Sequence, residues 1–229
     1  MANESEKELV GRASARFVNE GNIVGLGTGS TAVYAVQAVA DRVKAGLKIL
    51  CIPTSVRTKD QATSLGIPLT TLDEHQEIDL TIDGADEIDP NLCLIKGGGG
   101  ALLREKIIAS ASRKMVVIAD STKLVPVLGK FPLPVEVVGF AQAVVAKKIE
   151  AMGAEVSLRK DAAGKIYITD EGHHILDCKF GQIPDPPALA RKLSDIPGVM
   201  EHGLFIGLAS LVLIGKGNVV EEIRRAFPD

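Results

Sequence analysis

Two kinds of apolar segment alternate along the first half of the chain. Short apolar runs, typical of buried parallel strands, predict strands at residues 23–26, 48–52, 79–82 and 115–119. Segments whose apolar residues recur every three to four positions predict helices at 5–18, 32–44, 56–65 and 101–111. This alternation predicts an α/β fold with a doubly wound, mainly parallel, Rossmann-like sheet and right-handed crossovers.

The pattern changes at residues 131–134, Phe-Pro-Leu-Pro. Beyond them, strands are predicted at 135–138, 155–159, 165–169, 174–179 and 199–204, and helices at 141–152 and 187–194. If the two segments around the turn at 161–164 form one bent strand or hairpin arm, the order is close to βαββαβ, a ferredoxin-like arrangement.

The tail reads as a strand at 211–214 and a helix at 219–227, which we expect to return to the first domain. We therefore predict a Rossmann-like catalytic domain of residues 1–130 plus 206–229. An inserted ferredoxin-like α+β domain would span residues 131–205.

The composition gives no indication of binding to nucleic acid or to a membrane. A formal net charge of −3 over 229 residues favours neither nucleic acid nor membrane surfaces, and no apolar run has membrane-spanning length. The first ten residues are too polar for a signal peptide. Cys51, Cys93 and Cys178 are odd in number and lie in apolar segments, which indicates reduced core thiols. We expect a cytoplasmic protein.

A Gly/Ser/Thr loop lies between the first predicted strand and its helix and comprises Thr28, Gly29, Ser30 and Thr31. Backbone N–H groups at a helix start bind anions. A Walker loop would need a lysine before the Ser/Thr, and the third glycine of a dinucleotide fingerprint falls on Ser30. The loop therefore favours a small phosphorylated metabolite over a nucleotide. A tight turn without a ligand stays the alternative.

Acids, a lysine and four consecutive glycines gather between residues 79 and 106. Asp83 ends one predicted strand and Lys96 ends another, at 92–95. The glycines at 97–100 then lead into a helix that carries Glu105 near its start. An isolated glycine run reads equally well as a flexible hairpin tip, but the flanking lysine and helix favour a ligand-binding loop.

Polar residues follow one predicted strand after another. In an open α/β sheet ligands bind at the carboxyl ends of strands, so this placement predicts one shared site. The segments concerned are 28–31, 54–55, 83–86, 96–99 and Lys123.

Metal chemistry is the weaker interpretation. An EF-hand register that starts at Asp79 places Pro90 where the terminal Glu belongs, and His173 and His174 would face opposite sides of a strand. A magnesium site on Asp83, Asp86 and Asp89 stays open. Carboxylates beside a lysine and a phosphate loop instead indicate proton transfer on a small sugar phosphate.

Three motifs together resemble the ribose-5-phosphate isomerase family of type A: GLGTGST at 25–31, DGADEID at 83–89 and KGGGGALLREK at 96–106. The later Lys123 and the amino-terminal Lys7 also match, and the resemblance covers nearly the whole chain. It implies an aldose–ketose isomerase that interconverts D-ribose 5-phosphate and D-ribulose 5-phosphate through an enediolate, in the non-oxidative pentose phosphate pathway. It also implies no cofactor, no metal, and a homodimer or tetramer.

The resemblance further implies a role for each matched residue. Glu105 would be the base that moves the proton between C1 and C2. Asp83 would help to open the furanose and shuttle protons between O1 and O2, and Lys96 would steady the enediolate. Asp86 would complete the catalytic set. The implied substrate-binding residues are Lys7, Thr28, Gly29, Ser30, Thr31, Asp83, Gly84, Ala85, Asp86, Lys96, Gly97, Gly98, Gly99 and Lys123.

Two other functions stay open at this point. One is a related sugar-phosphate enzyme, such as an amino-sugar isomerase or deaminase. The other is a non-catalytic sugar-phosphate sensor, which would keep the phosphate loop but would not need Glu105 together with Asp83 and Lys96.

Overall fold

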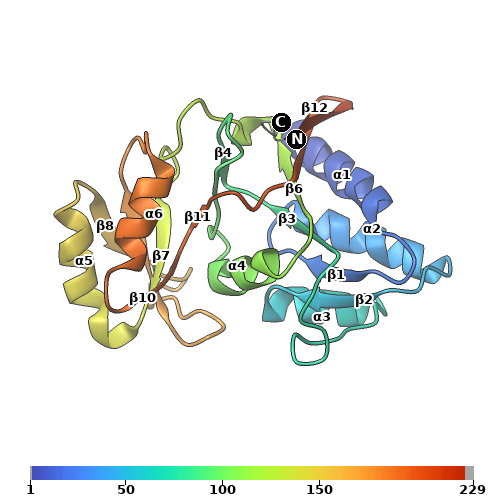
Figure 1. Ribbon diagram of the computed structural model, residues 1–229, viewed down its shortest axis with the longest axis horizontal. Coiled ribbons are helices and arrows are strands. Elements are labelled where there is room, and N and C mark those ends of the chain that lie inside the picture. Colours follow the sequence, from blue (N-terminus) through green and yellow to red (C-terminus); the bar gives the residue numbers. More distant parts are fainter. Residues whose placement is uncertain (1, 225–229) are drawn as a thin grey trace. The chain divides into compact units, whose positions relative to one another are not determined.

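The computed structural model describes residues 2–224, which form two compact units (Figure 1). The first unit contains residues 2–85, 104–123 and 207–224, and the second contains 86–103 and 124–206. The functional division predicted above, into residues 1–130 with 206–229 and residues 131–205, stays a prediction.

A six-stranded sheet in the order β13-β12-β6-β3-β1-β2 forms the centre of the first unit. All its neighbouring strands are parallel except β12 and β13. This confirms the predicted Rossmann-like, mainly parallel sheet. Its strands are β1 (Ile23–Leu26), β2 (Leu50–Pro53), β3 (Leu80–Gly84), β6 (Met115–Asp120), β12 (Leu211–Lys216) and β13 (Val219–Arg224).

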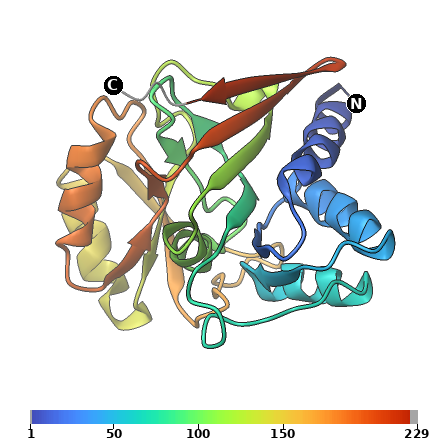
Figure 2. The same cartoon turned by 45° about the vertical axis from the view of Figure 1, so that its right-hand side comes forward.

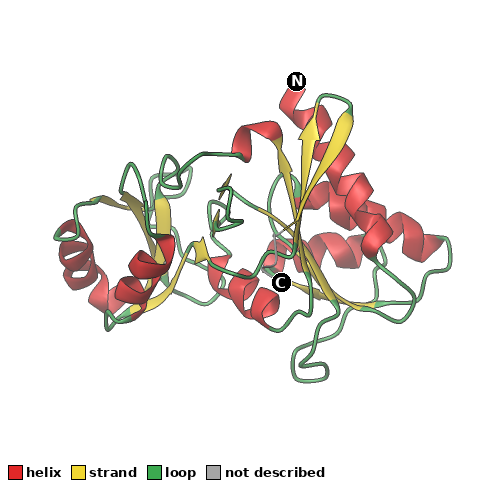
Figure 3. Ribbon diagram, turned by 45° about the horizontal axis from the view of Figure 1, so that its top comes forward, coloured by secondary structure: helices red, strands yellow, loops and turns green. Residues whose placement is uncertain are grey.

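Helices cover both faces of this sheet (Figure 3). Side chains alternate along β1, so Val24 and Leu26 pack with the first three helices, while Ile23 packs with Ile108 of the fourth. Gly25 faces the same side as Ile23, and a Cβ there would lie 2.7 Å from Ile108 and overlap the Thr81 hydroxyl. The helices are α1 (Ala2–Ser14), α2 (Ala32–Lys44), α3 (Val56–Ser64) and α4 (Leu102–Ser110), with short 3-10 turns at Ala15–Phe17 and Ser121–Lys123.

The predicted helix at 219–227 is wrong over residues 219–224, which form β13 (Figure 2); residues 225–227 lie outside the described part. Apolar residues at 219, 220 and 223 suit a helix as well as a strand. A two-residue turn decides the structure, because Gly217 has φ 60° and Lys216 pairs with Val219. The hairpin also covers the backbone edge of β12, which would otherwise stay unpaired.

The second unit contains a βαββαβ segment with sheet order β10-β7-β9-β8, which confirms the ferredoxin-like prediction. Leu133, Val135 and Val137 of β7 pack beneath its two helices. A separate three-stranded sheet has the order β11-β5-β4. The elements are β4 (Glu87–Ile88), β5 (Leu94–Ile95), β7 (Leu133–Val137), a 3-10 turn (Gly139–Ala141), α5 (Gln142–Glu150), β8 (Glu155–Leu158), β9 (His174–Lys179), α6 (Pro186–Ser194), β10 (Val199–His202) and β11 (Leu204–Phe205).

The predicted strand at 165–169 does not form. An isolated bridge pairs Lys160 with Ile166, so the segment is an irregular hairpin arm. Asp161 turns the chain there, because its Oδ1 accepts the N–H groups of Ala163 and Lys165, both at 2.9 Å.

All three cysteines are buried and none forms a disulfide, as predicted. Burial raises the pKa of the Cys51 and Cys178 thiols to about 12, which keeps both protonated near neutral pH. Among residues 2–224, no helix has the length and apolar character needed to cross a membrane.

Glu6 fixes α1 against the six-stranded sheet. One of its carboxylate oxygens accepts the N–H of Gly217 at 2.8 Å, and the other accepts the N–H and the hydroxyl of Ser121 at 3.0 and 2.8 Å. These hydrogen bonds, that of Gly217 first, lower the pKa of Glu6 below its ordinary value of 4.5. The buried carboxylate therefore joins the helix, the 3-10 turn after β6 and the β12–β13 turn.

We expect Glu6→Gln to lower the free energy of unfolding near neutral pH and to lose this effect in acid. A folded-state pKa below the unfolded value stabilises the fold above that value, and the contribution disappears as the pH falls through the folded-state pKa. Urea unfolding of wild type and variant at about pH 7, 5 and 3.5 measures the difference. Glu8→Gln, which removes a surface pair with Arg12, is the control. A difference that persists or grows in acid would contradict this assignment.

Candidate active site

The Gly27–Thr28 turn is locked to β3 by Asp83. The Gly27 N–H donates to the Ile82 carbonyl at 2.9 Å, and the Thr28 N–H donates to Asp83 Oδ1 at 3.0 Å. The same oxygen accepts the Gly84 N–H at 2.7 Å. A Cβ on Gly27 would overlap the Asp83 carboxylate, so only glycine allows this approach.

The outer part of this loop is less buried. Gly29 has φ 129°, and Ser30 is exposed between the buried Thr28 and Thr31. The loop leads into α2, so its tip presents backbone N–H groups at a helix start. Because the Thr28 N–H is already bonded to Asp83, the tip around Ser30 is the part open to an anion.

A chain of four hydroxyls lies beneath the loop. Thr28 Oγ1 lies 2.7 Å from both Thr54 Oγ1 and Ser55 Oγ. Ser55 donates to Thr58 Oγ1, and Thr58 donates to the Gly27 carbonyl, each at 3.0 Å. With one proton per hydroxyl, the chain runs from Thr54 through Thr28, Ser55 and Thr58 to Gly27. It fixes the loop from below.

Thr58 was not among the predicted site residues. The signal was available, because Ser55 precedes a helix and accepts the Thr58 N–H at 3.0 Å as its N-cap. The side-chain bond from Thr58 to the loop has no such sequence signature, since it joins positions 31 residues apart.

Lys7 and Lys123, both predicted to bind substrate, lie on elements that Glu6 connects. Lys123 ends the 3-10 turn whose first residue, Ser121, is bonded to Glu6, and Lys7 is the next residue of α1. The Lys7 ammonium lies 3.5 Å from Glu4, and its side chain is 18% exposed. Lys123 follows β6, as the strand-end argument predicted.

In the first unit the polar segments follow the carboxyl ends of parallel strands, as predicted. The loop at 28–31 follows β1, residues 54–55 follow β2, Asp83 is the penultimate residue of β3 and Lys123 follows β6. These four strands are consecutive neighbours in the parallel sheet. Their carboxyl ends therefore place these polar segments along one edge.

For Lys96 the prediction was wrong in one respect. The strand that precedes it, β5, belongs to the small antiparallel sheet and not to the parallel one. The lysine is only 2% exposed, and its ammonium lies 5.2 Å from the centre of the Phe205 ring, a cation–π contact. Its N–H donates to the Gly203 carbonyl at 2.9 Å. The structure thus holds the cation in a buried, ordered position.

Asp86 holds the glycine loop. Its Oδ2 accepts the Gly98 N–H at 2.8 Å, and a Cβ on Gly98 would come within 2.6 Å of its Oδ1. Gly97 and Gly100 have φ of 101° and 80°, which side chains rarely adopt. The loop is therefore a defined turn and not a flexible tip, and its Gly98 N–H is directed at a protein carboxylate.

Glu105 lies in the first turn of α4 and is 2% exposed. A helix start favours the ionised form of a carboxylate. Its position directly after the glycine loop is as predicted.

The three acids of the magnesium alternative all accept backbone N–H groups. Asp83 accepts the Thr28 and Gly84 N–H groups, Asp86 accepts that of Gly98, and Asp89 accepts those of Asn91 and Cys93. Within the described range 2–224, no cluster of three or more His, Cys, Asp or Glu side chains could hold a metal ion. His173 and His174 are likewise separate, bonded to Glu136 and Gln142.

Comparison with known proteins decides the family. A family model described as "Ribose 5-phosphate isomerase A (phosphoriboisomerase A)" matches residues 50–219. The chain is 52% identical over 234 aligned positions to the ribose-5-phosphate isomerase A of Bradyrhizobium diazoefficiens, covering 96% of this chain and 97% of that protein. The chain belongs to the ribose 5-phosphate isomerase A family. The resemblance seen in the motifs is confirmed.

Solved structures of the isomerase family share the whole fold. A D-ribose-5-phosphate isomerase in complex with phospho-erythronic acid superposes with a TM-score of 0.95 at 37% identity, covering 98% of this chain and all of that one. The ribose 5-phosphate isomerase of Plasmodium falciparum gives 0.94 at 38% identity, with coverage of 98% and 100%. That of Neisseria gonorrhoeae gives 0.92 at 37% identity, covering 98% of each chain.

We expect Thr58→Val to lower the free energy of unfolding by about 1–3 kcal/mol, because it leaves the Gly27 carbonyl and the Ser55 hydroxyl without their buried partner. Urea unfolding measures the change. Thr63→Val, at an exposed position of the same helix, is the matched control. If the two variants agree within about 0.5 kcal/mol, the hydroxyl chain has no stabilising role.

Proposed function

We propose that this isomerase-family chain interconverts D-ribose 5-phosphate and D-ribulose 5-phosphate through an enediolate. The observation that carries the proposal is a buried carboxylate, Glu105, in the first turn of α4 within a chain that matches the family over nearly its whole length. Moving hydrogen between C1 and C2 requires a base that removes a proton from carbon and returns it to the neighbouring carbon.

Phospho-erythronic acid, bound by the relative of known structure, supports this chemistry. Its carboxylate is planar and anionic, like the C1–C2 part of an enediolate, and the molecule also carries a phosphate. A site that binds it needs a cation for the planar anion and a separate phosphate site. The chain offers Lys96 for the planar anion, and the tip of the 28–31 loop with Lys7 and Lys123 for the phosphate.

Each predicted residue has a proposed role. Glu105 is the base, and Lys96 stabilises the negative charge that develops on the enediolate. Asp83 helps to open the furanose ring and shuttles protons between O1 and O2 while it holds the phosphate loop, and Asp86 orders the glycine loop. The phosphate and sugar contacts are proposed for Lys7, Thr28, Gly29, Ser30, Thr31, Asp83, Gly84, Ala85, Asp86, Lys96, Gly97, Gly98, Gly99 and Lys123.

The remaining expectations stay proposals. We place the chemistry in residues 1–130 with 206–229 and propose that the insert at 131–205 is a separate domain. The enzyme would act in the cytoplasm as a homodimer or tetramer, without cofactor or metal. Light scattering coupled to size-exclusion chromatography measures the assembly.

Turnover of ribose 5-phosphate tests the function. The purified chain is mixed with ribose 5-phosphate in the presence of a chelator, and formation of the ketose is followed. An isomerase produces ribulose 5-phosphate until equilibrium is reached. A chain that binds the sugar phosphate but forms no ketose would be a sensor, and one that turns over only an amino-sugar phosphate would belong to the other alternative.

Replacing the base should affect the chemical step. We expect Glu105→Gln to lower kcat by at least about 10²–10⁴-fold, because Gln keeps the size and hydrogen bonding of the side chain but cannot accept the proton. KM should change little, since an interaction made mainly in the transition state lowers kcat and kcat/KM together. Steady-state kinetics measures both constants. A variant with an unchanged kcat and a raised KM would show that Glu105 serves binding.

Lys123 should recognise the phosphate. We expect Lys123→Ala to weaken binding of ribose 5-phosphate about ten- to a hundredfold, the size of a lost charge-assisted contact, and to leave binding of unphosphorylated ribose nearly unchanged. Calorimetry with both sugars measures this, and Lys44→Ala, at an exposed position on α2, is the control. Equal weakening for both sugars would show that Lys123 does not contact the phosphate.

A further inference from the structure

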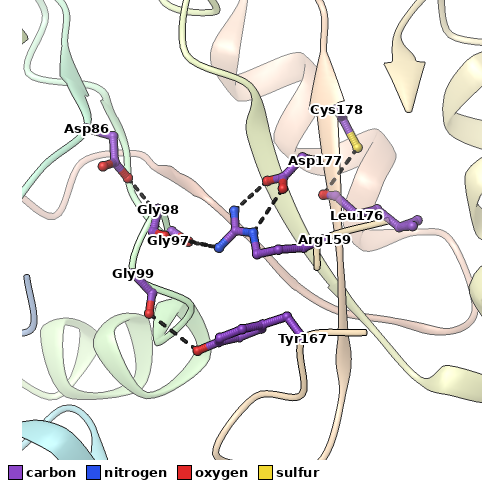
Figure 4. A network of polar contacts seen from close by, with 9 residues as sticks. All are labelled: Asp86, Gly97, Gly98, Gly99, Arg159, Tyr167, Leu176, Asp177 and Cys178. Carbon is purple, nitrogen blue, oxygen red and sulfur yellow. Dashed lines mark hydrogen bonds and ion pairs between the residues drawn. The ribbon is translucent and has the colours of Figure 1, made fainter. Parts of the chain in front are cut away.

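A partly buried arginine of the second unit binds the glycine loop from the side opposite to Asp86 (Figure 4). Arg159 follows β8, and its Nη1 donates to the Gly97 and Gly98 carbonyls at 2.8 and 3.2 Å (Figure 4). Its Nε donates to Asp177 Oδ2 at 2.9 Å, and its Nη2 donates to the other oxygen of Asp177. The Arg159 and Asp177 side chains are 13% and 22% exposed. The pair is thus a largely buried, two-point clamp.

The Gly97–Gly98 segment is consequently held on two sides. Its carbonyls accept from Arg159, while the Gly98 N–H donates to Asp86. The Gly97 carbonyl also accepts the Gly100 N–H at 3.0 Å, which closes the turn. Ordering four consecutive glycines costs more backbone entropy than ordering other residues, so a single conformation requires such anchors.

The segment around Arg159 is itself fixed to the sheet. Tyr167 donates to the Arg159 carbonyl through its N–H at 3.0 Å, and its ring lies so close to Gly100 that a Cβ there would overlap its hydroxyl. Thr169 and His173 both bond to Glu136 Oε1, at 2.9 and 3.0 Å. The irregular arm that replaced the predicted strand therefore supports the glycine loop.

We propose that Arg159, held by Asp177, is a positioning residue for the isomerase reaction. It fixes the peptide groups that directly follow Lys96, and so sets the direction of the loop N–H groups and of the chain that carries the lysine. The inference rests on the proposed function, because it assumes that Lys96 and the glycine loop bind the sugar part of the substrate. Arg159 acts through the loop and takes no proton.

The hydrogen bonds at position 159 require the guanidinium group of arginine. Only a guanidinium can donate to two glycine carbonyls and both carboxylate oxygens at once, whereas a lysine offers one ammonium group. Arg159→Lys should therefore retain the charge and lose the clamp. A misplacement of about 1 Å at a reacting group costs roughly 10²-fold in rate, so loosening the loop should be visible in catalysis and in binding of an enediolate analogue.

The experiment compares Arg159→Lys, Arg159→Met and Asp177→Asn with wild type. Lys179→Met is the matched control, because Lys179 and Glu155 form an exposed ion pair at 3.2 Å on the same two strands and touch none of the loop glycines. Two quantities are measured: amide hydrogen exchange at residues 97–100, and the dissociation constants of phospho-erythronic acid and of inorganic phosphate. Neither requires turnover, so both can be read even if the proposed reaction fails in the ketose assay.

In the Arg159 and Asp177 variants we expect amide exchange at Gly98 and Gly100 to quicken by about tenfold or more. Binding of phospho-erythronic acid should weaken about ten- to a hundredfold, while inorganic phosphate binding should stay unchanged. Lys179→Met should match wild type in amide exchange and in both dissociation constants. The proposal requires faster exchange together with selective loss of the sugar acid.

Either change without the other overturns the proposal, as does equal weakening of both anions. If Arg159→Met fails to fold, Arg159→Lys and Asp177→Asn carry the test, because each preserves the size of the side chain.

Discussion

The site depends first on the buried carboxylate of Asp83. It accepts two backbone N–H groups, from Thr28 and Gly84, and so ties the loop after β1 to the end of β3. The tie requires a glycine at position 27, since a Cβ would occupy the place of the carboxylate. An ionised oxygen that accepts two backbone donors is a strong, ordered contact. Asp83 therefore fixes the anion loop before any substrate is present.

The same device recurs along the chain. Glu6 accepts N–H groups of Ser121 and Gly217, Asp86 accepts that of Gly98, and Asp89 accepts those of Asn91 and Cys93. Glu6 and Asp86 each hold a turn beside a residue with a proposed role, Lys123 and Gly98 respectively. Fixed backbone dipoles need little reorganisation when charge develops on a substrate, which is the physical advantage of such pre-ordered sites. Glu105 is thus the proposed base, Glu6, Asp86 and Asp89 order the backbone, and Asp83 combines an ordering role with a proposed catalytic one.

The sequence pattern was sufficient to predict element boundaries where strand, loop and helix follow each other closely. β1 and α2 begin and end where the pattern predicted, because a short apolar run, a Gly/Ser/Thr loop and an unbroken helical period all agree. The helix predicted for the tail was wrong over residues 219–224, because Val219, Val220 and Ile223 fit both a helical and a strand period. The choice between helix and strand depends on the turn at Gly217 and on pairing with β12. The placement of Lys96 at the edge of the parallel sheet was wrong for a different reason: the apolar pattern predicts a strand end but does not tell which sheet the strand joins.

Contacts between residues far apart in the sequence could not be predicted from the sequence pattern. Thr58 bonds to Gly27, and Arg159 bonds to Gly97, 62 residues away. The N-cap at Ser55 marks Thr58 but does not indicate its bond to Gly27, and Arg159 lies in an irregular arm without a local signature. Such partners become visible only when the fold brings them together.

The proposed transfer of the proton between the two carbons by Glu105 can be tested by isotope exchange. The Glu105→Gln and Asp83→Asn variants are incubated with ribose 5-phosphate in deuterated water, and deuterium at C1 and C2 is measured by NMR. We expect Glu105→Gln to incorporate almost no deuterium where the wild type exchanges it. Near wild-type exchange in Glu105→Gln, together with its loss in Asp83→Asn, would make Asp83 the carbon base in place of Glu105.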